Sequence, residues 1–199
     1  MPLDSLVAPL AAFLAPASPL PPIAPLQFHS RGEVRTTLYA GVRLLGDDFE
    51  PAEENLLLGI ALDVREPGDR ASFEAGYFYS FGDGSAPSGA NTIDVESCVH
   101  ELWVGGRWTY DPFDSRLQPY VGIGLSVLRA EYQTAGLGLS SRDTGWAAGV
   151  YGHGGIAWEF GGGWAVGLDL RALYSTPATL QREVPLDYMQ AAFTLSWAW

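Results

Sequence analysis

Residues 164–175 read WAVGLDLRALYS, and in this stretch apolar side chains alternate with glycine and charged side chains. Successive side chains of a β-strand point to opposite faces of the sheet. One face of this strand is therefore apolar throughout, whereas the other holds Gly167, Asp169 and Arg171. A strand with one apolar face and one face that holds charged side chains requires an apolar environment on one side and a polar environment on the other.

The same alternation divides the chain from Glu33 onward into eight segments, this one included, each of at least the 9–11 residues that a tilted strand needs to cross a bilayer. Long loops (46–54, 82–94, 133–144 and 176–187) alternate strictly with short turns (66–70, 111–116 and 161–163). This order predicts an all-β fold, an eight-stranded antiparallel up-and-down transmembrane β-barrel with periplasmic termini and extracellular long loops. The predicted strands are Glu33–Leu45, Asn55–Arg65, Ala71–Phe81, Val95–Tyr110, Leu117–Tyr132, Gly145–Phe160, Trp164–Ser175 and Tyr188–Trp199.

The ionic faces of the strands also carry most of their glycines. The interior of an eight-stranded barrel barely admits side chains, so we expect these glycines to make room for long Arg and Glu side chains. Five arginines and five carboxylates balance in charge, as suits a closed interior in which an unpaired ion is costly. We therefore predict a salt-bridged interior plug formed by Arg35, Arg43, Asp63, Arg65, Glu74, Glu101, Arg107, His153, Glu159, Asp169 and Arg171.

Aromatic residues gather near the ends of the predicted strands. Amphipathic rings prefer the two membrane interfaces, so this distribution favours a membrane-spanning barrel over a soluble one. The predicted periplasmic girdle at the lipid interface includes Trp108, Trp158, Trp164, Trp197 and Trp199. The predicted extracellular girdle consists of Phe81, Tyr132, Trp146, Tyr174 and Tyr188.

Composition excludes several classes of function. The chain has a net charge of −12 and all its basic residues are arginine, which argues against nucleic acid as a partner. The single cysteine, Cys98, excludes an intramolecular disulfide and a Cys-based zinc site. The acidic run Asp47–Glu54 lacks EF-hand spacing and is expected to be a solvated loop. We predict no metal and no cofactor.

The first thirty residues differ from the rest because they contain seven prolines and one charged side chain. Residues 6–14 resemble the apolar core of a signal peptide, although no basic residue precedes them. We predict that residues 1–30 form a signal peptide or a Pro-rich leader, and that residues 31–199 form the barrel domain.

Two motifs carry a family resemblance. The run Pro119–Gly124 and the ending Phe193–Trp199 make the chain similar to the small outer-membrane barrels that include OmpA-like and OmpX-like proteins. The resemblance implies that the protein lies in the bacterial outer membrane and contacts lipopolysaccharide. It also implies that the barrel assembly machinery recognises the C-terminal strand. Members of the family usually end in Phe, whereas this chain ends in Trp.

Three functions follow from these observations. We favour a non-enzymatic barrel with an envelope-structural role or a surface-interaction role through its extracellular loops. The first alternative is a lipid-modifying hydrolase that uses Ser126, His153 and Glu159, although the chain lacks the His-x-Ser-Asn pattern of the lipid A deacylases. The second alternative is a soluble lipocalin-like carrier. His100, near the end of a predicted strand, is expected to have no partner.

Overall fold

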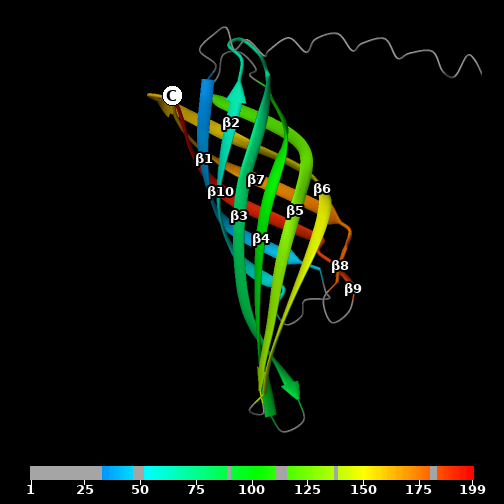
Figure 1. Cartoon of the computed structure of the whole chain (residues 1–199). Helices are drawn as coiled ribbons and strands as arrows, with labels where there is room; N and C mark the ends of the chain where they lie inside the picture. The colour runs from blue at the N-terminus through cyan, green and yellow to red at the C-terminus, as the bar shows by residue number, and fades with distance from the viewer. Residues whose placement is uncertain (1–32, 47–51, 89–90, 111–115, 137–138, 180–182) are drawn as a thin grey trace, which may run out of the picture.

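Eight antiparallel strands close into one barrel in the computed structural model (Figure 1). Each strand pairs with its neighbour in sequence, and β10 returns to pair with β1, so the predicted fold class is confirmed. The barrel strands are β1 (Glu33–Leu45), β2 (Glu54–Arg65), β3 (Ala71–Ser88), β4 (Asn91–Thr109), β5 (Leu117–Gly136), β6 (Leu139–Gly161), β7 (Trp164–Ser175) and β10 (Tyr188–Ala198). A small hairpin of β8 (Pro177–Thr179) and β9 (Glu183–Pro185) lies between β7 and β10.

The structure describes residues 33–46, 52–88, 91–110, 116–136, 139–179 and 183–199. The predicted leader, residues 1–30, and the first part of the acidic run, residues 47–51, lie outside these ranges. Within them, no helix is long and apolar enough to cross a membrane.

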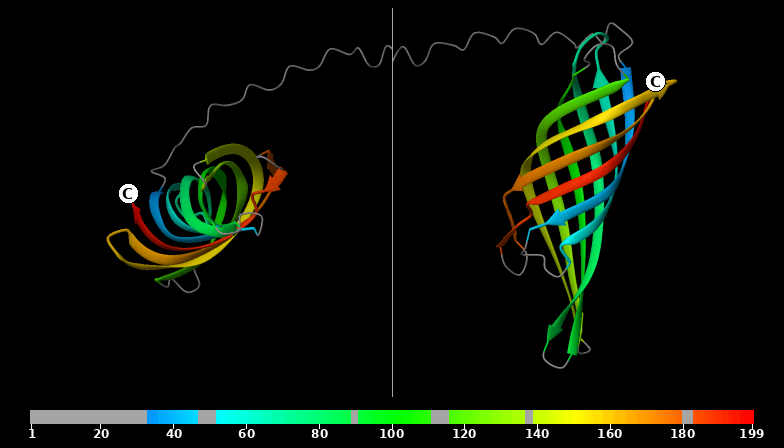
Figure 2. Two further views of the ribbon diagram at one scale, coloured as in Figure 1. Left: turned by 90° about the horizontal axis from the view of Figure 1, so that it is seen from below. Right: turned by 180° about the vertical axis from the view of Figure 1, so that it is seen from behind.

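The side chains alternate between a buried interior and an exposed outer wall, as the sequence predicts. Leu58 points outward and is 54% exposed, whereas Asp63 points inward and is 8% exposed. Because the apolar set covers the outside, the soluble lipocalin-like alternative is wrong: such a carrier keeps its apolar side chains within. Seen along its length, the barrel forms a closed ring (Figure 2).

The two ends of the barrel differ. Val34 and Trp199 exchange backbone hydrogen bonds, so the first and last strands meet at one end, which we call the terminal end. The turn from β6 to β7 at this end depends on Gly161, Gly162 and Gly163, which all adopt positive φ angles that other residues rarely adopt. The opposite end is the loop end.

The predicted loops 82–94 and 133–144 are largely strand, which corrects the sequence-based boundaries. The strand β2 pairs with β3 only as far as Phe81, and β7 pairs with β6 only as far as Gly149. Beyond these points β3, β4, β5 and β6 continue as a four-stranded sheet that extends past the barrel (Figures 1 and 2). We call residues 82–88, 91–97, 130–136 and 139–145 the projecting sheet. Its Gly- and Ser-rich sequence suggests loops, but the two hairpins satisfy each other's backbone groups by pairing side by side.

Candidate functional site

Glu101 of β4 lies at the centre of the barrel and receives contacts from across it. Arg43 Nη2 lies 2.6 Å from Glu101 Oε2, and Arg171 Nη2 lies 2.8 Å from Oε1. Tyr188 donates a hydrogen bond to the same carboxylate at 2.8 Å, and Ser126 donates one at 2.7 Å. These residues, with Gln190 beside Arg43, form the central cluster, which contains two guanidinium groups and one carboxylate.

His153 of β6 forms a second cluster between two carboxylates. Its Nδ1 lies 2.8 Å from Asp169 Oδ2, and its Nε2 lies 2.8 Å from Glu74 Oε1. Tyr120 donates to Asp169 at 2.9 Å and Tyr151 donates to Glu74 at 3.1 Å, so each carboxylate has a second partner. We call this group the histidine cluster.

A third group lies at the terminal end of the barrel. Arg35 contacts both Glu33, at 3.1 Å, and Glu159, at 2.6 Å, whereas Arg65 contacts Glu33 at 2.7 Å. The sequence-based prediction missed Glu33, although it shares its parity on β1 with Arg35 and could have been found by that signal. Asp63, which is also buried, accepts a hydrogen bond from Ser72.

The predicted interior residues therefore all point into the barrel, but with different degrees of burial. Arg65 and Glu159 are partly exposed at the terminal end, whereas the other predicted interior residues are buried. Among the described residues, Arg107 forms no salt bridge. Its guanidinium instead stacks on the Tyr120 ring, with the Cζ 3.6 Å from the ring centroid.

Aromatic rings fill much of the interior, and several of the glycines make room for them rather than for Arg or Glu side chains. A Cβ atom at Gly59 would lie 2.2 Å from the Phe78 ring, and one at Gly76 would lie 2.6 Å from the Trp103 ring. Phe78 and Trp103 stack at a centroid distance of 5.6 Å. The sequence-based prediction missed these rings, although their positions share parity with the charged residues.

The three residues of the predicted hydrolase do not come together. Ser126 bonds to Glu101 and Arg171, His153 contacts Glu74 and Asp169, and Glu159 contacts Arg35 at the terminal end. Ser126 and His153 thus belong to different clusters, and the predicted group of nucleophile, base and orienting carboxylate is not assembled. Among the described residues, no group of three or more His, Cys, Asp or Glu side chains is arranged to hold a metal ion.

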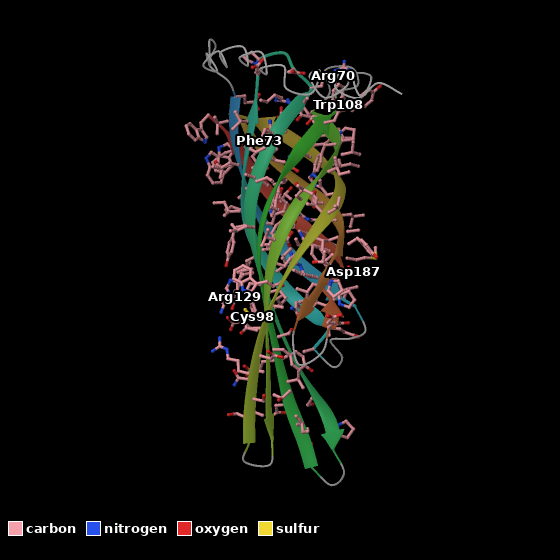
Figure 3. All side chains as sticks on the ribbon, turned by 45° about the vertical axis from the view of Figure 1, so that its right-hand side comes forward. Arg70, Phe73, Cys98, Trp108, Arg129 and Asp187 are labelled. Carbon is pink, nitrogen blue, oxygen red and sulfur yellow. The ribbon has the colours of Figure 1, made fainter. Side chains whose placement is uncertain are left out.

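The predicted terminal-end girdle lies on the outer wall. Trp108, Trp158, Trp164 and Trp199 are exposed there, and Trp197 packs beside Trp164 with a centroid distance of 5.7 Å. Figure 3 shows Trp108, Arg70 and Phe73 at this end of the barrel. Tyr188 does not belong to the opposite girdle, because it points inward to Glu101.

A polar group interrupts the apolar outer wall near the loop end. His100 Nδ1 lies 2.6 Å from Tyr77 Oη, and its Nε2 lies 3.6 Å from Cys98 Sγ, so the prediction that His100 has no partner is wrong. On the neighbouring strand Arg129 Nη2 lies 2.7 Å from Glu131 Oε1, and Arg142 pairs with the same carboxylate. Cys98 and Arg129 lie diagonally across the β4–β5 ladder where the projecting sheet leaves the barrel (Figure 3), because Cys98 pairs with Glu131 and Arg129 pairs with His100.

The outer face of the projecting sheet contains a polar hollow of about 710 Å³. Carboxylates dominate the charged residues of its lining: Asp83, Asp94, Glu96 and Glu131 contribute to it together with a single arginine, Arg142. Asp83 and Glu96 are direct Cα partners in the β3–β4 ladder, so two like charges face each other there. Like charges in this arrangement repel, and the hollow therefore has a negative character.

Comparison with known proteins identifies one matching family and several solved structures with the same fold. The outer membrane protein β-barrel domain matches residues 6–198. Neisserial surface protein A has a TM-score of 0.50 at 14% identity, with 84% of this chain and 97% of that protein covered. The attachment invasion locus protein of Yersinia pestis, Ail, solved with the heparin analogue sucrose octasulfate, has a TM-score of 0.55 at 11% identity, with 85% and 100% covered. No curated protein matches the chain by sequence.

Proposed function

The chain belongs to the outer membrane protein β-barrel family, and from this premise we propose that it is a surface-interaction protein whose barrel anchors the projecting sheet. The protein lies in the bacterial outer membrane. Barrels of this kind have short periplasmic turns and longer extracellular loops. The terminal end then faces the periplasm, and the loop end with the projecting sheet faces the outside.

The single observation that supports this proposal most is the projecting sheet itself. Four strands continue past the barrel with ladder pairing as far as Ser88↔Asn91 and Gly136↔Leu139. A paired sheet presents its side chains at fixed positions, and a preorganised surface loses less conformational entropy on binding than a flexible loop does. We infer that this sheet, rather than a set of separate mobile loops, is the binding surface.

The charge of the projecting sheet favours a basic partner. Its described residues include five carboxylates (Asp83, Asp94, Glu96, Glu131 and Asp143) and one arginine, Arg142. Charge complementarity governs encounter rate and partner choice at such surfaces. Ail was solved with sucrose octasulfate, a polyanion. For this chain we expect the opposite preference, namely a protein surface rich in Lys and Arg.

We also propose that the interior neither conducts large solutes nor catalyses a reaction. The central and histidine clusters cross the lumen with buried ion pairs, and interior aromatic rings pack against them. The Ser126, His153 and Glu159 side chains make contacts with other partners instead of with one another. Lipopolysaccharide incubated with the protein should release no acyl chain by mass spectrometry. Release that disappears in His153→Ala would overturn this part of the proposal.

The surface-interaction proposal can be tested with the full chain in nanodiscs, where both ends are accessible. We expect an immobilised nonaarginine peptide to retain the protein at low salt and heparin not to retain it. The double variant Asp83→Asn/Glu96→Gln should bind the peptide several-fold more weakly. The matched control is Glu66→Gln/Asp69→Asn, which removes the same charge from the exposed turn at the terminal end. Stronger retention on heparin than on the peptide would refute the proposed partner chemistry.

A further inference from the structure

A groove of about 770 Å³ runs over the outer wall of β2, β3, β4 and β5, and apolar atoms line nearly all of it. Its floor is set by Ala75, which lies between Leu62 and Val104 in one row of Cα partners. Both neighbours have longer side chains, so the small Ala75 side chain leaves the wall hollow at this point. The groove opens outward, where the barrel meets the hydrocarbon of the membrane.

The groove leads directly into the polar group on the outer wall. The row of the groove nearer the loop end consists of successive Cα partners on β2 to β5, namely Ile60, Tyr77, Leu102 and Val127. The next outward-facing row contains Tyr79, His100 and Arg129 as consecutive partners. Tyr77 connects the two rows, because it lines the groove and its hydroxyl lies 2.6 Å from His100 Nδ1.

The height of this polar row corresponds to the headgroup level of the outer leaflet. Trp108, in the terminal-end girdle, and His100 both point outward from β4, and eight residues separate them. Eight residues of strand rise about 26 Å at about 3.3 Å each, and a strand tilt of about 35–45° reduces this to a height of about 20 Å across the membrane. The apolar band of such barrels is about 25 Å tall. His100 and Arg129 therefore lie near the outer edge of that band, from which the long Arg129 side chain can extend to the headgroups.

The charge at this boundary is unusual for the chain. On the barrel strands Arg35, Arg43, Arg65, Arg107 and Arg171 point inward, whereas Arg129 and Arg142 are on the outer face. These two arginines share one carboxylate, that of Glu131, so the three side chains together carry one net positive charge, although Arg142 also lines the acidic hollow. The Arg129 side chain is 40% exposed. An exposed guanidinium suits phosphate, which it can bind through two parallel N–H···O bonds.

We propose that this part of the outer wall is a binding site for a phosphate-bearing, acylated lipid of the outer leaflet, namely the lipid A portion of lipopolysaccharide. Its acyl chains lie in the groove over Ala75, and a sugar phosphate binds Arg129, with His100 and Tyr79 beside the headgroup. The carboxylates of Asp83 and Glu96 lie four residues farther from the membrane than Tyr79 and His100, which keeps them away from the phosphate. The site adjoins the acidic hollow, which Tyr79, Glu131 and Arg142 also line, but the proposed lipid contacts do not depend on the proposed protein partner.

The test uses the full chain folded into phosphatidylcholine vesicles that contain bisphosphorylated lipid A, or the same lipid without phosphate. After mild detergent extraction, native mass spectrometry measures how much lipid A remains bound. We expect the bisphosphorylated lipid to be retained about tenfold more than the phosphate-free one. Arg129→Gln should remove this difference, and Ala75→Leu, which fills the groove, should lower retention of both lipids.

Two control variants separate the site from general effects of charge and volume. Arg70→Gln removes an exposed arginine at the terminal end, and Ala40→Leu adds the same side chain to the outer wall of β1. Both controls should retain lipid A as the unaltered protein does. Equal retention of both lipids by the unaltered protein would overturn the proposal. Retention of lipid A by Arg129→Gln equal to that by Arg70→Gln, or by Ala75→Leu equal to that by Ala40→Leu, would also overturn the proposal.

Discussion

Arg43 Nη2 lies 2.6 Å from Glu101 Oε2 in the middle of the barrel, and both side chains are fully buried. The two residues belong to β1 and β4, which are not neighbours in the barrel, so the contact crosses the lumen. Arg171 contacts the other oxygen of the same carboxylate. One anion thus compensates two buried cations, and its removal leaves both uncompensated.

Glu101→Gln should therefore be the most destabilising charge change in the interior. Breaking a buried ion pair by removing one partner costs about 3–5 kcal/mol. The measurement is the urea midpoint of unfolding in lipid vesicles. Glu96→Gln on the exposed face of the projecting sheet is the control and should change stability by less than about 0.5 kcal/mol. If both variants unfold at the same midpoint, Glu101 does not compensate the two arginines.

Gly105 and Gly106 are adjacent on β4 and provide a matched pair for the packing of the interior. A Cβ atom at Gly105 would lie 2.2 Å from Tyr151 Oη and 2.6 Å from a backbone oxygen, whereas one at Gly106 meets nothing closer than 3.9 Å. Overpacking typically costs about 1–3 kcal/mol. We expect Gly105→Ala to destabilise the barrel by this amount and Gly106→Ala to be neutral or stabilising in the same unfolding assay. The reverse order would contradict the assignment of the inner face.

Glu131 lies in the projecting sheet, outside the membrane-spanning part of β5. The hydrogen bond from Arg142 holds the pKa of its carboxyl below the usual value; burial opposes this effect, and the charge of Arg129 adds to it. A depressed pKa in the folded state means that the contact stabilises the sheet above the ordinary carboxyl pKa. That contribution is lost as the pH falls through the folded-state value.

The protection factors of the amides of residues 130–136, which are corrected for the intrinsic pH dependence of hydrogen exchange, should therefore fall on acidification below pH about 4.5. In Arg142→Gln the Glu131 carboxyl should titrate at a higher pH, which carbon-13 NMR of the labelled side chain measures directly. A Glu131 pKa that is the same in both proteins would show that the Arg142 contact has no energetic effect.

Large solutes should not cross the barrel. Eight-stranded barrels have interiors just wide enough for side chains to fill, and the central and histidine clusters lie across this one. Vesicles that contain the protein should show no swelling in arabinose, in contrast to vesicles that contain a sixteen-stranded porin. Swelling comparable to that of the porin would contradict the proposal of a closed lumen.

Several features followed from the sequence by itself, because they depend on local periodicity. In WAVGLDLRALYS the period of two assigns each residue to one face without knowledge of any partner, and β7 has the bounds that the sequence predicted. The inward direction of Arg43, Glu101 and His153 followed in the same way. The side-chain alternation was enough to predict the number of strands, and the strict order of long and short connections was enough to predict the closed antiparallel topology.

Only the tertiary structure decided which side chains meet, because contacts across a barrel depend on the tilt and stagger of its strands. His153 contacts Glu74 on β3 rather than Glu159 on its own strand. The projecting sheet could not be predicted from the sequence, because its Gly- and Ser-rich segments lack an apolar alternation. The pairing of its two hairpins with each other makes them strands. Nor could the groove over Ala75 be predicted, since it exists only because four strands bring larger neighbours around one small side chain.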